Sequence, residues 1–266
     1  MRTATVALCA MAITGCNLQY HMLYYPSPHL PSEAELAANQ IAFWPSAPAA
    51  YRGFIGTGQT GTAKGTVVVF HGNAGTASDR AYYVKPLGSL GYRVILAEYP
   101  GYGRREGPLG EQSFVRDAQA TIRLAAETYA EPLFLLGESL GCGVAAGAAT
   151  DASLRIGGIV LITPWDTLAS VAKSLFPWFP VGLLLKDKYD SIANLRSYAG
   201  PVAVIGAERD EILPIRHARA LYESLGANKR MWTLRGVGHN DWSMTVDIPK
   251  WREFMDFVGG GKESTS

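Results

Sequence analysis

The segment Gly137–Gly141 reads Gly-Glu-Ser-Leu-Gly, so one serine stands between two glycines after an apolar run and before a run of small residues. This Gly-x-Ser-x-Gly spacing is typical of a sharp strand-to-helix turn that raises the serine hydroxyl above the backbone. Glycines are needed there because the flanking backbones approach too closely for a Cβ atom. We therefore predict that Ser139 is a nucleophile; a structural Gly/Ser turn is the alternative.

A nucleophilic serine needs a base to take its proton, because an alcohol reacts poorly near neutral pH. Of the five histidines, His239 lies in a glycine-rich segment between an expected strand and the last expected helix. Loops at the carboxyl ends of parallel strands are where such folds place their chemistry. We predict that His239 is the base. His217, on an expected helix, fits a packing or solvated residue.

The base in turn needs a carboxylate that fixes its tautomer and offsets the charge of the imidazolium. For this type of turn the chain order is serine, acid, histidine, so the acid should precede His239 and follow a strand. Asp210 is the best match among three carboxylates in the segment 207–214. Asp166, which follows another expected strand, is the rival candidate.

The tetrahedral intermediate of acyl transfer carries an oxyanion, which needs hydrogen-bond donors already aimed at it. The backbone amide of Leu140, directly after the nucleophile, is the first expected donor. The second should come from the loop that follows the expected strand 66–70 and reads His-Gly-Asn-Ala-Gly over 71–75. We expect Asn73 to donate there. An ordinary turn is the alternative, because Asn and Gly favour turns.

These residues fall within an alternation of apolar strand-type runs and helix-type segments, which predicts an α/β domain over 51–260. Its sheet should be mostly parallel and flanked by helices. About forty residues interrupt the alternation, so we expect a short lid insertion at about 165–198, with a decorated core helix as the alternative. The expected strands are 66–70, 93–98, 132–136, 158–162, 202–205 and 230–234, and the expected helices are 77–90, 111–129, 141–149, 215–225 and 241–258.

The composition fits a globular domain and excludes several classes of protein. Of the 266 residues, 48% are hydrophobic and 18% are charged, which is too apolar for a disordered chain. Lys and Arg number 24, Asp and Glu number 23, and basic runs are missing, so a nucleic-acid partner is not expected. The three cysteines have no spacing typical of a zinc site, and we expect neither a metal nor a cofactor.

The N-terminus reads as a targeting segment: one basic residue precedes a short apolar run that ends in Ile-Thr-Gly-Cys at Cys16. The run is much shorter than the ~20 residues that span a bilayer, which favours a signal peptide over a permanent membrane helix. Ile-Thr-Gly-Cys resembles the bacterial lipobox. The resemblance implies a signal peptide over 1–15, lipidation of Cys16 and a lipoprotein anchored outside the cytoplasm in the outer or cytoplasmic membrane. A plain secretory signal is the alternative, and 16–50 should form a lead-in or tether.

With these motifs in order, the chain resembles the alpha/beta-hydrolase-fold serine hydrolases over roughly 53–258. Phe70–Gly75 and Tyr99–Gly103, together with Tyr24–Pro26 before the domain, are similar to the branch that holds membrane-associated protein depalmitoylases and bacterial relatives. The resemblance implies hydrolysis of an ester or thioester through an acyl-enzyme on Ser139. Two features depart from it: the acid loop has Glu-Arg-Asp where an acidic pair is common, and a cysteine at 142 beside the turn has no evident role.

The expected partner is a small-molecule or lipid acyl ester, and the aromatic and leucine-rich segment 165–185 could form a wall for its acyl chain. Two other functions remain open. A peptidase or amidase could use the same three residues, because their geometry does not select the leaving group. A non-catalytic surface lipoprotein that keeps the fold as a binding module is less favoured, because every expected catalytic position is filled.

Overall fold

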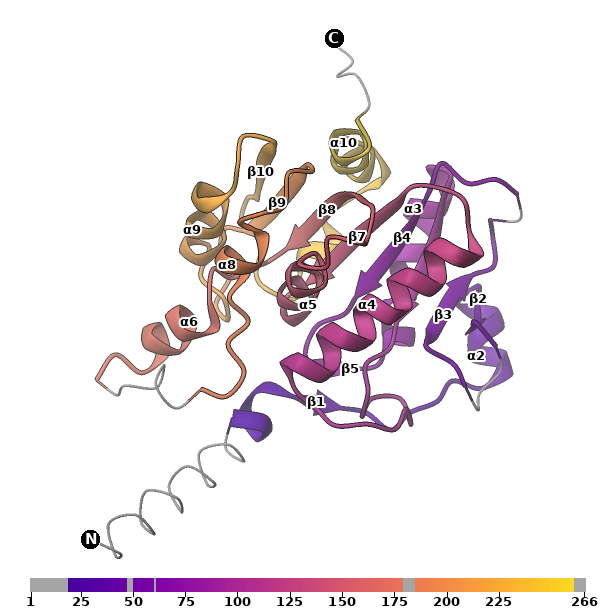
Figure 1. The fold of residues 1–266 in the computed structure, drawn as a ribbon, viewed down its shortest axis with the longest axis horizontal. Helices are drawn as coiled ribbons and strands as arrows, with labels where there is room; N and C mark the ends of the chain where they lie inside the picture. The colour runs from indigo at the N-terminus through magenta and orange to yellow at the C-terminus, as the bar shows by residue number, and fades with distance from the viewer. Residues whose placement is uncertain (1–18, 47–49, 60, 179–184, 261–266) are drawn as a thin grey trace, which may run out of the picture.

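The computed structural model describes residues 19–46, 50–59, 61–178 and 185–260, and an eight-stranded sheet lies at its centre (Figure 1). Neighbouring strands are parallel from β10 to β6, whereas β3 is antiparallel to both β6 and β2. The expected α/β fold with a mostly parallel sheet is therefore confirmed. From edge to edge the strands are β10 (Lys229–Leu234), β9 (Val202–Ala207), β8 (Ile156–Ile162), β7 (Leu133–Glu138), β4 (Gly65–Phe70), β6 (Tyr92–Ala97), β3 (Gly53–Gly56) and β2 (Ile41–Trp44).

Helices cover both faces of this sheet and enclose two apolar cores. The central strands are continuously apolar because each of them faces a core on both sides. In β4, Val68 and Phe70 belong to the first core, whereas Val67 and Val69 belong to the second. The first core includes residues of α4 (Glu111–Thr128), α5 (Leu140–Ala148), α8 (Ser191–Leu195) and α9 (Arg216–Ser224), and the second includes residues of the 3-10 helix η1 (Ala77–Tyr83), α3 (Val84–Ser89) and α10 (Ile248–Val258).

The expected strands are all present with small shifts at their ends, but two expected helices are divided. Residues 77–90 form η1 and then α3, and residues 241–258 form the 3-10 helix η2 (Trp242–Met244) and then α10. The second division has a local cause. Asp247 caps the first turn of α10 with its side chain, and Pro249 lies in that turn, where a missing N–H is tolerated.

Part of the expected lead-in is integrated into the domain. β1 (Tyr25–Pro26) pairs in parallel with β5 (Ala74–Gly75), which lies just beyond β4. α2 (Glu33–Ala38) begins with a capping box, and β2 then adds an edge strand to the sheet. A four-residue apolar run before a proline carries too little alternation to be told from a loop, which is why β2 was not expected.

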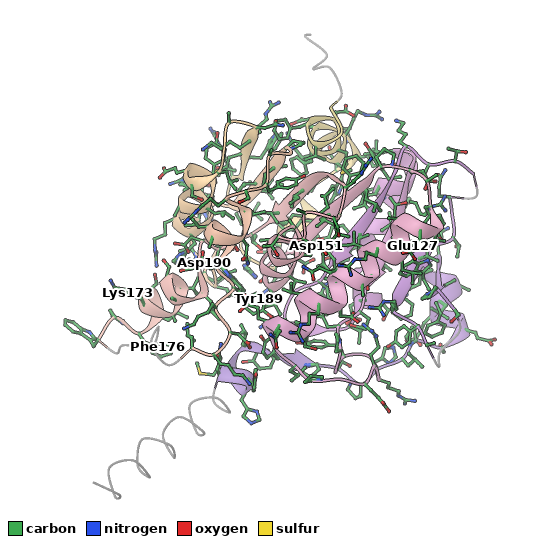
Figure 2. All side chains as sticks on the ribbon, viewed as in Figure 1. Glu127, Asp151, Lys173, Phe176, Tyr189 and Asp190 are labelled. Atoms are coloured by element: carbon green, nitrogen blue, oxygen red, sulfur yellow. The ribbon has the colours of Figure 1, made fainter. Side chains whose placement is uncertain are left out.

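The expected insertion at about 165–198 contains α6 (Leu168–Leu175) and α8. Phe176 lies at its outer end, and Tyr189 lies nearer the body of the molecule (Figure 2). Residues 179–184, which carry much of the leucine-rich sequence, lie outside the described residues.

Trp165, at the start of the insertion, is a core residue and not a wall for a ligand. Its side chain is buried, and its Nε1 donates to the carbonyl oxygen of Tyr189 at 3.1 Å. This bond joins the start of the insertion to the segment directly before α8, as does the antiparallel bridge between Thr167 and Asp190. The part of the insertion that contains α6 is therefore closed off at its base.

The signal peptide expected over 1–15 and the lipidation position Cys16 lie outside the described residues. Within the part of the chain that is described, every helix is too short or too polar to cross a membrane.

Candidate active site

Ser139 lies on the sharp turn between β7 and α5. Its backbone has φ 52° and ψ −114°, a conformation that residues other than glycine rarely adopt. The neighbouring glycines permit this turn by close packing. A Cβ atom on Gly137 would lie 2.5 Å from the carbonyl oxygen of Gly141, and one on Gly141 would lie 1.9 Å from that of Phe70. The strained turn therefore depends on both glycines of the motif.

The structure brings together Ser139, His239 and Asp210 from three separate loops. The Oγ of Ser139 lies 3.1 Å from Nε2 of His239, and Nδ1 of the same ring lies 2.7 Å from Oδ2 of Asp210. Asp210 follows β9 and His239 follows β10, so both come from the carboxyl ends of neighbouring parallel strands. The histidine and the aspartate are buried. This is the geometry in which an imidazole can take a proton from a serine hydroxyl while a carboxylate orients it.

Backbone amides fix the carboxylate of Asp210. Its Oδ1 accepts the N–H groups of Leu213 at 2.6 Å and Ile212 at 3.0 Å, which leaves Oδ2 for the ring of His239. The two oxygens thus have separate partners, and the orientation of the acid does not depend on the histidine alone.

The other two carboxylates of the acid loop hold the loop that carries the base. Glu208 accepts the N–H of Gly236 at 2.7 Å, and Glu211 accepts the N–H of His239 at 3.3 Å. Hydrogen bonds from its own backbone amide and from that of His239 hold the pKa of Glu211 below its usual range. The sequence indicated three competing acids, whereas in the structure one faces the imidazole ring and the other two bind backbone.

Asp166, the rival acid, pairs with a different histidine. Its Oδ1 lies 2.9 Å from Nδ1 of His217, a buried residue of α9. Nε2 of His217 in turn lies 3.2 Å from the Oγ of Ser174, so a second Asp-His-Ser arrangement exists. Ser174 lies within α6, and its hydroxyl donates to the carbonyl oxygen of Ser170. Neighbouring N–H groups in a helix are engaged in helical bonds, so this serine lacks the donors that an oxyanion needs.

The expected oxyanion loop lies against the nucleophile. A Cβ atom on Gly72 would lie 3.7 Å from the Cβ of Ser139, so the backbone of this loop touches the turn that carries Ser139. Asn73 follows Gly72 in this loop. Leu140 is the first residue of α5, and N–H groups in the first turn of a helix have no partner within the helix. Both expected donors therefore border Ser139.

A buried contact between His71 and Glu98, which the sequence did not reveal, holds the start of this loop. Nδ1 of His71 donates to the carbonyl oxygen of Gly72 at 2.7 Å, and its Nε2 lies 2.9 Å from Oε1 of Glu98. Oε2 of Glu98 accepts the N–H of Ala77 at 3.0 Å. The carboxylate thus joins the end of β6 to both sides of the oxyanion loop. The two partners stand far apart in the chain, so only the fold could indicate the contact.

Glu138, directly before the nucleophile, is the centre of a second polar cluster. It accepts the hydroxyls of Tyr82 at 2.6 Å and Tyr83 at 2.9 Å, and Arg80 lies 3.3 Å away. Burial and the adjacent carboxylate of Glu138 raise the pKa of both tyrosines. The tyrosines therefore stay neutral and act as hydrogen-bond donors that hold the turn against η1.

Cys142, for which the sequence indicated no role, packs beneath the catalytic turn. Its Sγ lies 3.2 Å from the carbonyl oxygens of both Gly137 and Ile162. Burial raises the pKa of this thiol well above its usual value, so it remains protonated. A neutral thiol in such a place acts as a small packing group and not as a nucleophile.

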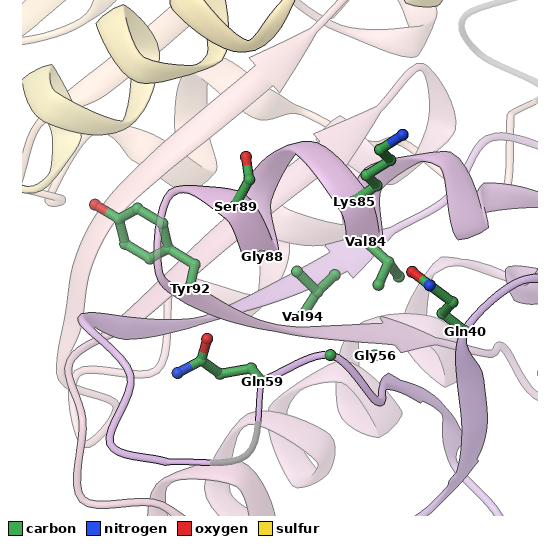
Figure 3. A pocket seen from close by; sticks show the side chains of 10 residues that line it. Gln40, Gly56, Gln59, Val84, Lys85, Gly88, Ser89, Tyr92 and Val94 are labelled. Atoms are coloured by element: carbon green, nitrogen blue, oxygen red, sulfur yellow. The ribbon is translucent and has the colours of Figure 1, made fainter.

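A hollow of about 250 Å³ lies away from these residues, between α3 and the strands β3 and β6 (Figure 3). Val84, Lys85 and Tyr92 are among the residues that line it, whereas Ser139, Asp210 and His239 are not. Among the described residues there is also no group of three or more His, Cys, Asp or Glu side chains arranged to hold a metal ion.

Comparison with known proteins relates this chain to hydrolases. The family model described as "Serine aminopeptidase, S33" matches residues 61–186. Uncharacterized protein Rv2307c of Mycobacterium tuberculosis is 32% identical over 247 residues, covering 89% of this chain and 87% of its own. Lysophosphatidylserine lipase ABHD12 of Danio rerio is 28% identical over 184 residues, covering 62% of this chain and 48% of its own.

Solved structures share the fold at lower identity. An esterase of Pyrococcus furiosus, Pf2001, has a TM-score of 0.64 at 16% identity and covers 88% of this chain and 97% of its own. A monoacylglycerol lipase of Paleococcus ferrophilus has a TM-score of 0.56 at 21% identity and covers 76% of this chain and 97% of its own. At this level of identity the likeness extends to the architecture of the sheet and its helices.

Proposed function

Because this chain belongs to the alpha/beta-hydrolase family, we propose that it hydrolyses carboxylic esters or thioesters through an acyl-enzyme on Ser139. The observation that carries the proposal is the continuous contact from Ser139 Oγ to His239 Nε2, 3.1 Å, and from His239 Nδ1 to Asp210 Oδ2, 2.7 Å. The relatives and structural neighbours, which include lipases and an esterase, support an acyl ester as substrate.

The proposed reaction has two steps. In the first, Ser139 Oγ attacks the acyl carbon, and its proton passes to Nε2 of His239 while Asp210 stabilises the resulting imidazolium. The amides of Leu140 and Asn73 hold the oxyanion, and the departing alcohol or thiol takes the proton from His239. In the second step, water loses a proton to His239 and attacks the acyl-enzyme, which releases the acid and restores the serine.

A serine-directed fluorophosphonate probe tests this proposal on the purified chain. The probe should label the wild type and spare Ser139→Ala. The matched control is Ser174→Ala, because Ser174 also lies 3.2 Å from a histidine ring nitrogen but on an ordinary helix. This control should be labelled like the wild type. Equal labelling of Ser139→Ala and the wild type would refute the proposal, because another serine would then be the reactive one. A wild type that is not labelled would favour a non-catalytic binding module.

A peptidase or amidase is the second candidate, because the matching family model is described as a serine aminopeptidase. The two functions differ in the leaving group. Rates on p-nitrophenyl acyl esters of several chain lengths, on acyl thioesters and on aminoacyl anilides separate them. Faster turnover of anilides than of esters would replace the first candidate by the second.

We also propose that the protein is a membrane-anchored lipoprotein of the cell envelope, lipidated at Cys16. The support is the Ile-Thr-Gly-Cys sequence that follows a short apolar run. Leu175, Phe176 and Trp178 on the insertion expose large apolar side chains, which suits work on a lipid acyl ester. Metabolic labelling with radioactive palmitate should mark the wild type and not Cys16→Ser. Labelling of both the wild type and Cys16→Ser would show that the lipid is attached to another residue.

A further inference from the structure

The lead-in segment forms backbone hydrogen bonds with the oxyanion loop. In the β1–β5 pairing, the N–H of Tyr25 donates to the carbonyl oxygen of Asn73 at 2.9 Å, and the N–H of Ser27 donates to that of Gly75 at 3.2 Å. The hydroxyl of Tyr102 donates to the same oxygen of Asn73 at 2.7 Å. The carbonyl of the expected oxyanion donor is thus held by two groups, one of which belongs to the lead-in.

The lead-in is itself fixed to the body of the domain at this point. The side chain of Tyr24 is buried; its hydroxyl donates to Oδ2 of Asp187 at 2.7 Å and lies 3.0 Å from that of Tyr189. The ring of Tyr24 also packs edge-on against Phe114 of α4 at 5.2 Å between centroids. On the other side, the carbonyl of Ser27 accepts the N–H of Gly103 at 2.9 Å. The N–H of Tyr25 therefore has a defined position.

The peptide geometry connects this bond to the active site. Asn73 stands between two carbonyls that are both held: that of Gly72 by Nδ1 of His71, and its own by Tyr25 and Tyr102. In a planar trans peptide the C=O of Gly72 and the N–H of Asn73 point in opposite directions, so holding the first aims the second. Holding the carbonyl of Asn73 then prevents the residue from rotating about its own backbone bonds.

We propose that the lead-in is a positioning element of the active site, in which the backbone N–H of Tyr25 holds Asn73 in the orientation that stabilises the oxyanion. This inference rests on the proposed ester hydrolysis at Ser139. Oxyanion donors act on the transition state more than on the bound substrate, and small displacements of such groups are costly. Loss of the bond should therefore lower kcat and leave KM nearly unchanged.

The test compares Tyr25→Pro with Tyr25→Ala in the full chain. Proline removes the N–H that donates to Asn73, whereas alanine keeps it and removes only a half-exposed ring and its hydroxyl, which donates to the carbonyl oxygen of Met22 at 3.1 Å. On a soluble p-nitrophenyl ester, Tyr25→Pro should lower kcat about ten-fold with KM within about two-fold, and Tyr25→Ala should stay within about two-fold in both. Amide hydrogen exchange over 71–75 should be faster in Tyr25→Pro than in Tyr25→Ala.

If circular dichroism shows that Tyr25→Pro does not fold, a second variant still tests the inference. Tyr24→Phe removes the hydroxyl contacts that fix the lead-in and leaves β1 itself intact, so kcat should fall by a few-fold at constant KM. Wild-type kcat and wild-type exchange in the folded lead-in variants would overturn the inference. Ser139→Ala separates the two proposals. If Ser139→Ala keeps full activity, the proposal of ester hydrolysis at Ser139 fails. If Ser139→Ala is inactive while the lead-in variants keep the wild-type kcat, only the positioning inference fails.

Discussion

Two aspartates in this protein each hold a buried histidine, yet only one of the two pairs lies beside a serine on a strained turn. Asp210 lies 2.7 Å from His239 and Asp166 lies 2.9 Å from His217, so the distance between acid and base does not separate them. The difference lies in the serine. Ser139 occupies a strained turn beside the oxyanion loop, whereas Ser174 lies within a helix. Chain order favoured Asp210, which in the structure lies beside His239, but it could not indicate that Asp166 has its own partner.

This difference predicts that two matched substitutions act on different properties, one on kcat and the other on stability. Asp210→Asn should lower kcat by about 10⁴-fold with little change of fold, because the amide cannot hold the productive tautomer of His239. Asp166→Asn should leave kcat within about ten-fold but lower the free energy of unfolding by about 1–3 kcal/mol, because it weakens a buried polar pair. Ester hydrolysis and urea unfolding of both variants check this. The assignment of the acid is wrong if Asp166→Asn proves the more damaging of the two to kcat.

At the scale of elements, the central strands could be predicted from the sequence because they are nearly continuous apolar runs buried on both faces, as in β4, β7 and β9. The polar contacts that hold the catalytic loops could not, because they join residues distant in the chain. Glu98 meets His71 only when β6 lies beside β4, and Glu211 meets the backbone of His239 only when β9 lies beside β10. Short strands such as β2 could not be predicted from the sequence either, because four residues carry too little periodicity.

The contact of Glu211 with the loop after β10 has a predictable pH dependence. The pKa of the Glu211 carboxyl is lower in the folded protein than its usual value. The ionised carboxylate therefore stabilises the fold at a pH above the ordinary carboxyl pKa of about 4.3. This contribution is lost as the pH falls through the lowered pKa. The melting temperature of the wild type should therefore exceed that of Glu211→Gln at pH 7. The difference should shrink as the pH falls and disappear once the pH lies below the lowered pKa of Glu211. Glu223→Gln, on α9, is the control and should show a smaller difference at pH 7. A Tm difference for Glu211→Gln that grows on acidification would contradict this reading.

At the scale of the whole molecule, the first described residues lie at the end of the sheet where Ser139, Asp210 and His239 meet. Gln19 accepts the N–H of Lys186 and donates to the carbonyl oxygen of Asp187 within the insertion, and Tyr25 binds the expected oxyanion loop. In Figure 1 the described N-terminal segment and α6 lie at the same end of the molecule. The three residues from Cys16 to Gln19 can span at most about 11 Å. A lipid on Cys16 would therefore attach the protein to a membrane close to its active site.

This placement predicts that the anchor affects substrates in membranes and not soluble ones. Cys16→Ser should hydrolyse a soluble p-nitrophenyl ester with the kcat and KM of the wild type, because the catalytic residues are untouched. On an acyl ester embedded in vesicles its rate should fall at least about ten-fold, because a tethered enzyme meets membrane substrate at a high effective concentration. Ser139→Ala supplies the background in both assays. Equal rates of wild type and Cys16→Ser on the vesicles would show that the anchor does not deliver the active site to the bilayer, whereas a loss on both substrates would mean that Cys16 is needed for the fold.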